Sequence, residues 1–470
     1  MTRTLLLATL AAGALAATPA LAQDAAGVPE ASAFVFNTLL FLIGGFLVMW
    51  MAAGFAMLEA GLVRSKNVSM QCTKNIALYS LAGLMFTLIG YNILYPGGWG
   101  DGLGEGEVSR WLIDGWVGDP TPYEIKSYDD AGELTVDTSA GYSLGSDFFF
   151  QLMFCAATAS IVSGTVAERV KLWPFLIFTA VLTGVMYPIV ASWQWGGGVL
   201  SAAGFSDFAG STLVHSTGGW AALAGAILLG ARKGKFVDGQ VRPIPGSNMP
   251  LATLGTFILW LGWFGFNGGS QLAMGSIEDA DAVSQIFANT NIAASGGALV
   301  ALLLTQLMYG KVDLTMVLNG ALAGLVAITA EPLAPTMLES VLIGGVGGLI
   351  VVFTVPLLDR LRIDDVVGAI PVHLFAGIWG TIAVAFNTQT AYELESGEEA
   401  TRTMAEQIMV QLYGVGLVGL FVFVASFVIW MLLKLTVGIR VSEEEEYLGL
   451  DASEIGIEAY PEFGRGSQTI

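Results

Sequence analysis

The chain contains eleven apolar runs of membrane-spanning length, and this feature limits most strongly what it can fold into. A helix that crosses the hydrocarbon core needs about 20 mostly apolar residues. Hydrophobic residues make up 54% of the sequence and charged residues 12%, whereas soluble domains have about 25% charged residues. The sequence therefore predicts an all-α polytopic membrane protein with eleven transmembrane helices. The expected spans lie near residues 33–61, 69–95, 148–167, 172–195, 209–231, 250–270, 290–309, 313–330, 337–357, 366–387 and 407–435.

Basic residues in the connecting loops support this count. If the N-terminus is external, thirteen basic residues fall on the cytoplasmic side and three on the external side. Lys and Arg favour cytoplasmic loops, so we expect a multi-pass protein of the cell inner membrane with a periplasmic N-terminus and a cytoplasmic C-terminus. The expected external loops are acidic and include Glu278, Asp279 and Asp281. The thirteen cytoplasmic residues are Arg64, Lys66, Arg169, Lys171, Arg232, Lys233, Lys235, Arg242, Lys311, Arg360, Arg362, Lys434 and Arg440, and the three external residues are Arg110, Lys126 and Arg402.

The beginning of the chain has the three parts of a secretory signal peptide. Arg3 supplies the positive charge, Leu5 to Ala17 form an apolar run, and Ala20-Leu21-Ala22 forms a small-residue cleavage site. We expect cleavage after Ala22. An uncleaved first helix is the alternative, although the run is short for a membrane span. The expected domains are a signal peptide at 1–22, an eleven-helix transmembrane domain at 23–436 and a cytoplasmic tail at 437–470.

The expected tail begins with an acidic run. Four consecutive glutamates, Glu443 to Glu446, follow Ser442, and the residues from Leu448 to Ile470 also carry a net negative charge. Such a run is either a solvated segment or a docking surface for a basic partner.

The two histidines of the chain, His215 and His373, both lie inside apolar runs. An imidazole in hydrocarbon must find a polar partner or line a cavity, because an unpaired polar group there is unfavourable by several kcal/mol. Either histidine alone is as well explained by a packing role with a bond to a backbone carbonyl. Two intramembrane histidines with none elsewhere favour a shared function. They lie in the fifth and tenth expected spans, as predicted if spans 1–5 and 6–10 are inverted repeats around a central pore.

Aromatic residues gather in two other apolar segments. Residues 260–270 hold two Trp, two Phe, an Asn and a Ser, and residues 192–198 hold two Trp followed by three glycines. Each segment alone is as typical of a core or of an aromatic belt at the membrane surface. Cys72 and Cys155 lie in apolar runs, which gives no support for a disulfide framework or a thiolate metal site. We expect no metal and no cofactor.

Several motifs together resemble those of the Amt/Rh family of ammonium transporters, in its bacterial and plant Amt branch. They appear in the family's order over nearly the whole mature chain. The resemblance implies a homotrimer in which each protomer conducts NH4+/NH3 through its own pore, with a PII-type signalling protein as a cytoplasmic partner at the tail. The motifs are residues 53–67, Asp207 to Gly210 leading to His215, Trp263 to Asn267, Asp364-Asp365 leading to His373, and Ser442 to Glu446.

The resemblance also implies an external substrate site and a gate. Trp195 and Ser270 look like the residues that bind the cation against an aromatic face and a hydroxyl. The resemblance also implies that Phe154 contacts the substrate, and with Phe266 it looks like the stacked pair that closes the pore from outside.

The resemblance also assigns four further residues to the pore. His215 and His373 look like twin histidines whose rings contact each other, Asp207 resembles a supporting buried carboxylate, and Trp263 resembles a pore tryptophan. The sequence departs from the family pattern near His373, where Pro371 precedes it by two positions and the small residue Gly377 follows only after three others. Glu331 lies in a connection that is less charged in the family, and the sequence does not explain it.

The chemistry of the ammonium ion explains why these residue types would occur together. A tetrahedral cation with four N–H donors is well served by π-faces and one hydroxyl acceptor, whereas sodium or potassium would need several oxygen ligands. Beyond an apolar gate the neutral form of ammonium should be favoured. Each histidine ring offers one donor and one acceptor and can relay a proton or bind ammonia. The sequence leaves open whether NH3, NH4+ or NH3 with a separately relayed proton crosses.

Two other classes of function are alternatives. An ammonium sensor or transceptor would use the same site and signal through the tail. An intramembrane enzyme would use Ser270 as nucleophile and His215 as base, but Ser270 lacks the Gly-x-Ser-x-Gly setting that activates such a serine. We therefore expect a transporter and not an enzyme.

Overall fold

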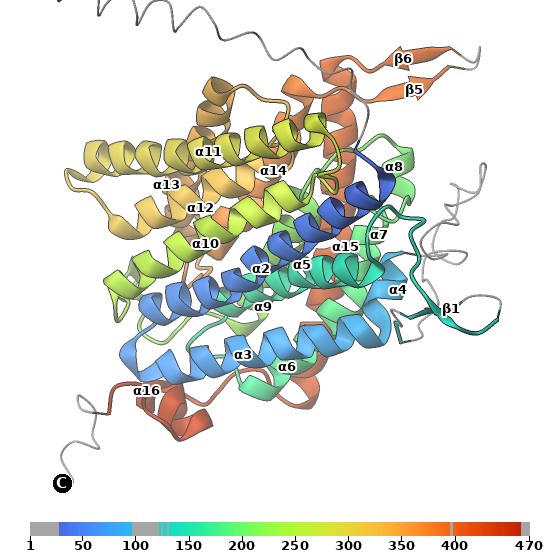
Figure 1. Ribbon diagram of the computed structural model, residues 1–470. Helices are drawn as coiled ribbons and strands as arrows, with labels where there is room; N and C mark the ends of the chain where they lie inside the picture. Colours follow the sequence, from blue (N-terminus) through green and yellow to red (C-terminus); the bar gives the residue numbers. More distant parts are fainter. Residues whose placement is uncertain (1–27, 96–121, 124–125, 129–130, 395–397, 462–470) are drawn as a thin grey trace, which may run out of the picture.

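The computed structural model describes residues 28–95, 122–123, 126–128, 131–394 and 398–461, and it shows a helical bundle (Figure 1). The predicted signal peptide at 1–22 lies outside the described residues. The α-helices are α2 (Glu30–Leu62), α3 (Val68–Met85), α4 (Tyr91–Leu94), α5 (Leu144–Thr165), α6 (Leu172–Val181), α7 (Tyr187–Ser192), α8 (Val199–Ala202), α9 (Thr217–Leu229), α10 (Met249–Gly269), α11 (Ile277–Tyr309), α12 (Leu314–Ile328), α13 (Met337–Arg360), α14 (Ala376–Asn387), α15 (Met404–Thr436) and α16 (Glu443–Leu448).

Short irregular helices and hairpins complete the bundle. A 3-10 turn, η1 (Ser65–Asn67), precedes α3. Of five π-helical turns, four continue or begin longer helices and the fifth follows α16, and three antiparallel hairpins lie in the connections. The π-turns are η2 (Phe86–Gly90), η3 (Leu182–Met186), η4 (Ser211–Ser216), η5 (Ile370–Phe375) and η6 (Asp451–Ile455), and the hairpins pair β1 (Ser127–Tyr128) with β2 (Leu134–Thr135), β3 (Phe236–Val237) with β4 (Gln240–Val241), and β5 (Ala391–Glu393) with β6 (Glu399–Thr401).

The all-α polytopic class predicted from the sequence is confirmed. Within the described residues, ten helical segments are long and apolar enough to cross a membrane. The eighth expected span, 313–330, corresponds to α12, an apolar helix of 15 residues that is shorter than the other ten. The count of eleven spans therefore stays an expectation.

The seventh helix begins earlier than its apolar run predicted. The expected span was 290–309, but α11 begins at Ile277, so Glu278, Asp279 and Asp281 belong to its first turns and not to a loop. The Ser276 hydroxyl accepts a hydrogen bond from the backbone N–H of Asp279 at 3.0 Å. A capping serine and acidic residues stabilise a helix N-terminus, so the helix extends beyond the apolar residues that signal a span.

Glycines let the helices approach one another at backbone distance. A Cβ atom at Gly344 of α13 would lie 2.0 Å from the carbonyl oxygen of Ala293 in α11, and one at Gly297 of α11 would lie 2.1 Å from that of Gly320 in α12. Figure 1 shows α2 and α10 side by side, and at Gly61 an added Cβ would lie 2.5 Å from the backbone nitrogen of Ala252. Small residues at such contacts are typical of membrane helix packing.

The acidic tail is only partly solvated, which corrects one reading of its glutamates. Glu443, Glu444 and Glu445 are exposed or half-exposed, but Glu446 is 2% exposed. Its carboxylate accepts hydrogen bonds from the backbone N–H of Lys233 at 2.7 Å and from the Arg440 guanidinium at 2.7 Å. Lys66 donates to its carbonyl at 2.9 Å. The tail thus packs on its own protomer, beside the ends of α3 and α6 (Figure 1).

The glycine contacts generate a stability prediction. Gly344→Ala should reduce the free energy of unfolding by about 1–3 kcal/mol, because the new methyl group would overlap the Ala293 carbonyl and force α11 and α13 apart. The matched control is Gly83→Ala in α3, where the nearest atom is Leu152 Cδ2 at 3.9 Å. Thermal unfolding in one detergent should show a lower Tm for Gly344→Ala only. Equal melting temperatures of the two variants would show that this helix contact is not close-packed.

Candidate functional site: a buried histidine pair under an aromatic stack

The structure brings the two histidines into direct contact. His215 lies in η4 and His373 in η5, and their Nδ1 atoms are 3.2 Å apart. The ring centroids are 5.2 Å apart with an interplanar angle of 26°. Two Nδ1 atoms at this distance share one proton, so one ring donates and the other accepts. The Nε2 atom of each ring then faces away from the pair, and that of His215 has no hydrogen-bond partner among the described residues.

A carboxylate fixes the backbone that carries His215. Asp207 Oδ1 accepts hydrogen bonds from the backbone N–H groups of Gly210 and Ser211, at 3.1 and 2.8 Å. Its Oδ2 accepts from those of Thr212 and Leu213, at 2.8 and 2.9 Å. Four otherwise unpaired donors of a helix start are satisfied in this way. Asp207, predicted as a supporting residue, therefore acts as the cap of η4.

Asp365 does the same for the segment that carries His373, a role that the sequence analysis missed. Its Oδ1 accepts from the backbone N–H of Gly368 at 3.2 Å and from the Thr165 hydroxyl at 3.0 Å, and its Oδ2 accepts from the N–H of Ile370 at 2.7 Å. A repeated spacing was the available signal: in both segments a Gly follows the Asp by three residues and the His follows it by eight.

The backbone conformation of the two segments is also alike. Gly210 and Gly368 have φ values of +107° and +81°, in the left-handed region that favours glycine. This shared cap is in keeping with the expected inverted repeat.

Two glycines, each four residues after a histidine, allow the two histidine segments to pack closely. An added Cβ at Gly219 would lie 2.7 Å from Leu374 Cβ, and one at Gly377 would lie 2.5 Å from the Ser211 carbonyl oxygen. Close packing of the two segments thus explains the position of Gly377, which departs from the family pattern. Pro371 lies at the start of η5, where its missing N–H breaks no helical hydrogen bond.

Aromatic rings cover the outer side of the histidine pair. Phe154 and Phe266 stack with ring centroids 4.1 Å apart, and Phe266 stacks on His215 at 5.2 Å. The Trp263 ring stacks on His215 at 5.0 Å, and its Nε1 donates to the Thr329 hydroxyl at 2.8 Å. Phe154 and Phe266 are 1% and 0% exposed. The two gate residues implied by the resemblance therefore form one stack that ends on the imidazoles.

The expected external site lies at the edge of this stack. Trp195 is half-buried, its ring meets Phe154 edge-on at 6.0 Å, and its Nε1 donates to the Asp207 carbonyl at 3.2 Å. Ser270 is also half-buried, and its hydroxyl donates to the Phe266 carbonyl at 2.8 Å, which leaves the oxygen lone pairs free to accept. Among the described residues no hydrogen bond joins Trp195 and Ser270, which come from different parts of the chain.

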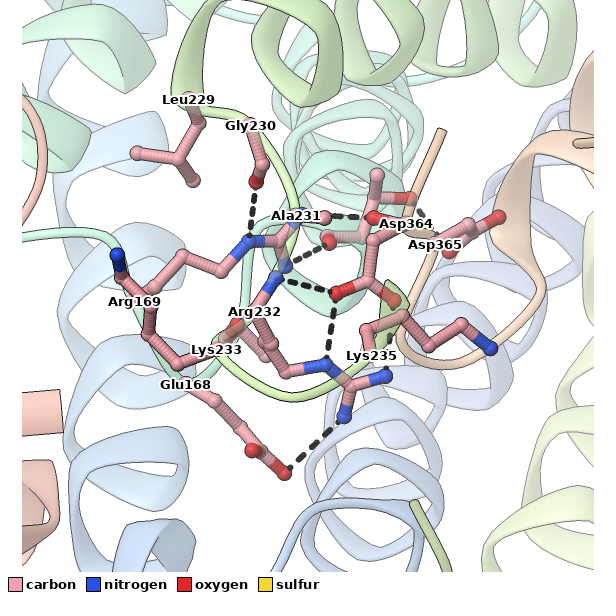
Figure 2. A network of polar contacts seen from close by, with 12 residues as sticks. Glu168, Arg169, Leu229, Gly230, Ala231, Arg232, Lys233, Lys235, Asp364 and Asp365 are labelled. Carbon is pink, nitrogen blue, oxygen red and sulfur yellow. Dashed lines mark hydrogen bonds and ion pairs between the residues drawn. The ribbon is translucent and has the colours of Figure 1, made fainter. Parts of the chain in front are cut away.

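A charge network fixes the residue that precedes Asp365 (Figure 2). Arg232 donates to both carboxylate oxygens of Asp364, at 2.8 and 2.9 Å, and contacts Glu168 at 3.4 Å. Arg169 donates to the Asp364 carbonyl at 2.7 Å. Burial alone would raise the pKa of Asp364, but the hydrogen bonds from Arg232 and the nearby charge of Arg169 hold it well below its usual value. The network anchors the start of the His373 segment at the tail side of the bundle, the side on which α16 packs.

Glu331, which the sequence did not explain, closes a turn. Its Oε1 accepts from the backbone N–H groups of Leu333 and Ala334 at 3.2 and 3.1 Å, and its Oε2 accepts from the Thr388 hydroxyl at 2.8 Å. It therefore ties the α12–α13 connection to the end of α14. Across the described ranges, no group of three or more His, Cys, Asp or Glu side chains is arranged to hold a metal ion.

Comparisons with known proteins agree with this architecture. Residues 39–460 match the family model described as the Ammonium Transporter Family. The chain is 42% identical to the ammonium transporter Amt2 of Archaeoglobus fulgidus, over 90% of this chain and 87% of the relative, and 38% identical to a putative ammonium transporter of Synechocystis, over 90% and 89%. A solved structure titled Sensor Amt Protein superimposes with a TM-score of 0.78 at 32% identity, over 91% of this chain and 100% of that one. Mep2 of Candida albicans gives 0.71 at 27%, over 92% of each chain.

The charge network generates a prediction for stability and its pH dependence. Asp364→Asn should lower the free energy of unfolding by about 3–5 kcal/mol, because it removes the carboxylate that accepts two hydrogen bonds from the buried Arg232 guanidinium and leaves only the longer contact with Glu168. Since the pKa of Asp364 is depressed in the folded state, its stabilisation is complete at neutral pH and is lost as the pH falls below about 3.9, the usual value for Asp. The wild-type Tm should therefore drop in this acid range more steeply than that of the variant.

The matched control for this prediction is Asp359→Asn. Asp359 pairs with Lys235 at 2.9 Å, but its side chain is 25% exposed, so the loss should be about 1 kcal/mol or less. Equal losses of Tm in Asp364→Asn and Asp359→Asn would contradict the anchoring role of the network.

Proposed function

This chain belongs to the ammonium transporter family and is an ammonium transporter, and we propose that it passes its substrate as ammonia and a proton that separate at the Phe154–Phe266 gate. The observation that carries the proposal is the unbroken stack from Phe154 through Phe266 and His215 to His373. This stack offers π-faces and imidazole nitrogens to a substrate but no carboxylate.

Recognition is proposed to occur at Trp195, Ser270 and Phe154. An ammonium ion there would lie against aromatic faces and donate one N–H to the Ser270 hydroxyl oxygen, which already donates its own hydrogen to Phe266. Potassium would find one oxygen ligand where it needs several. The hydrogen bond from Ser270 to the Phe266 carbonyl also supports a non-enzymatic role for this serine. A nucleophilic serine would donate to a base, and no described hydrogen bond joins Ser270 to His215.

Separation of the proton follows from the lining of the gate. Below Phe266 the substrate meets Trp263 and His215, both 0% exposed, in surroundings where a bare cation is strongly disfavoured. Neutral ammonia can donate to the unpartnered Nε2 of His215 or accept from it, according to the tautomer of the ring. The shared Nδ1 proton gives a second route, along which one ring accepts a proton while the other releases one.

The finer assignments of compartment and assembly are also proposals. We propose that the signal peptide at 1–22 is removed, that the mature chain crosses the inner membrane eleven times within 23–436 with its N-terminus periplasmic, and that three copies assemble, each with its own pore. The positive charge of the tail-side loops supports this orientation. A PII-type protein is proposed to bind the cytoplasmic face at the tail, residues 437–470, where Glu443 and Glu444 remain exposed.

Ammonium sensing is the second candidate function. It is favoured by the likeness to the Sensor Amt Protein and by the contacts of the tail with pore-side loops. Glu446 binds the backbone of Lys233, next to Arg232, and Asp451 accepts from the backbone N–H of Met70 in α3 at 2.8 Å. A shift of α3 or of this loop would therefore reach the tail directly.

The test of the proposed function is selective current. Protein reconstituted in liposomes on a solid-supported membrane should give a current after an ammonium jump, and potassium in large excess should not suppress it. Ser270→Ala should weaken apparent ammonium affinity by about 5- to 10-fold, the equivalent of one lost hydrogen bond of roughly 1 kcal/mol. Ser284→Ala is the matched control, because that hydroxyl also donates to the carbonyl four residues earlier, at 2.9 Å, but is exposed on α11. Comparable block by potassium would contradict the proposed site.

A further inference from the structure

A buried acid and a buried base lie inside the bundle on the tail side of the histidine pair, and the transport path proposed above does not use them. Glu59 of α2 is 1% exposed and Lys74 of α3 is 0% exposed. Both lie within apolar spanning segments. Ionisable side chains at such depth are rare, because removing them from water is costly, and they usually serve a proton or ion pathway.

The two oxygens of the Glu59 carboxylate have unequal surroundings. Oε2 accepts three hydrogen bonds, from the side-chain amides of Gln71 and Asn75, the latter at 2.6 Å, and from the Ser163 hydroxyl at 2.8 Å. Oε1 accepts none from the described residues. A Cβ added at Gly164 would lie 3.2 Å from Oε1 and 2.4 Å from Val367 Cγ2, so Oε1 and this valine both face Gly164. One oxygen is therefore fixed and the other is free.

Glu59 lines a cavity that also touches the histidine pair. The cavity is lined by Glu59, His373, Asn319 and Val367, among others. Asn319 and Val367 also line a wider cavity that opens among charged residues, including Arg232 and Asp365. The two cavities are adjacent, since they share Asn319 and Val367, and the Asn319 amide donates to the Val367 carbonyl at 3.0 Å. Together they reach from the inner imidazole and Glu59 to charged groups on the tail side of the bundle.

Lys74 balances the charge of Glu59 without occupying its free oxygen. The lysine Nζ donates to the Ser163 carbonyl at 2.7 Å and lies 5.0 Å from the centre of the Phe175 ring. The other ionisable groups near Glu59 are His373, which shares the cavity, and Cys72 of α3; α5 and α12 contribute the neutral Ser163 and Asn319. A nearby positive charge keeps a buried carboxylate available as a base.

We propose that Glu59 is the group that accepts the proton from His373 and releases it to the tail-side cavity. This inference rests on the proposed function, because it supplies the exit for the proton that the histidine pair relays. Glu59 is distinct from Asp207 and Asp365, whose oxygens accept the backbone N–H groups that cap η4 and η5.

The proton balance of the step is simple. A proton binds Nε2 of His215, the shared proton passes from Nδ1 of His215 to Nδ1 of His373, and the Nε2–H bond of His373 breaks. Water in the cavity carries this last proton to Oε1 of Glu59, which forms a neutral acid and then loses the proton to water in the wider cavity. One proton enters and one leaves, and no electrons are transferred.

A purely structural role would be the alternative for this acid. A carboxylate that only joins helices gains most by using both oxygens, as Asp364 does with Arg232. Glu59 instead concentrates three donors on Oε2, and Oε1 accepts no hydrogen bond from the described residues. The arrangement holds the side chain in one orientation and keeps a basic oxygen accessible.

The test is Glu59→Gln in proteoliposomes that contain a luminal pH dye. The glutamine carbonyl can still accept from Gln71, Asn75 and Ser163, so the fold should persist, but the side chain no longer binds a proton at neutral pH. We expect the ammonium-jump current to fall by about a hundredfold, the usual contribution of a positioned acid or base. We also expect the lumen to become alkaline faster than in protein-free liposomes, because ammonia still passes and takes up a luminal proton.

The matched control is Asp147→Asn. Asp147 of α5 is also buried in a span, at 0% exposed, and accepts from the Tyr91 hydroxyl at 2.7 Å, but it is not part of the cavity below His373. Its variant should keep the wild-type current.

Each outcome decides the proposal. Undiminished current in Glu59→Gln overturns it, and so does loss of both the current and the luminal alkalinisation, which would show a structural role. A tenfold or greater loss of current in Asp147→Asn, on the same scale as a general acid or base effect, would also overturn it, because any buried acid would then be required. Failure of the proposed function looks different: the wild-type protein itself would give no ammonium-dependent current and no luminal alkalinisation above that of protein-free liposomes.

Discussion

The contact between His215 Nδ1 and His373 Nδ1 is the interaction on which the rest of the site depends. Two imidazoles can share one proton only if neither backbone segment drifts, and each segment is fixed by a carboxylate that binds its unpaired N–H groups. The cap on the His215 segment also fixes the orientation of the His215 imidazole. Phe266 and Trp263 can therefore pack on this ring. The aromatic stack of Phe154 and Phe266 therefore rests on the histidine pair that it covers.

Close approach of backbones supplies the second constraint. Gly219 and Gly377 let the two histidine segments meet, and Gly344 and Gly297 do the same for α11, α12 and α13. With little hydrophobic force between helices in lipid, such contacts and buried hydrogen bonds hold the bundle together. Two of the buried carboxylates have cations beside them: Asp364 lies between two arginines, and Glu59 has Lys74 nearby.

The sequence predicts the class of fold well, because spanning length and loop charge are properties of composition and position alone. It also singles out His215 and His373, since a polar ring in an apolar run has few explanations. The start of α11 was misplaced because a serine cap and acidic first turns extend a helix beyond its apolar residues. Glu59 and Lys74 were overlooked for a similar reason: single charges inside strongly apolar runs do not change where a span is drawn. The burial of Glu446 depends on Arg440 and the Lys233 backbone, contacts that no local pattern of the tail encodes.

The claim that the histidine pair relays the proton is tested most directly by ammonium-jump currents of His215→Leu and His373→Leu in the same liposomes as the wild type. Leucine is apolar and of similar size, so it removes the donor and the acceptor while filling much of the same space. The account predicts that each variant loses its ammonium current by about a hundredfold or more, whether or not ammonia still passes. Undiminished ammonium current in both variants would contradict it and leave His215 and His373 as lining of the pore.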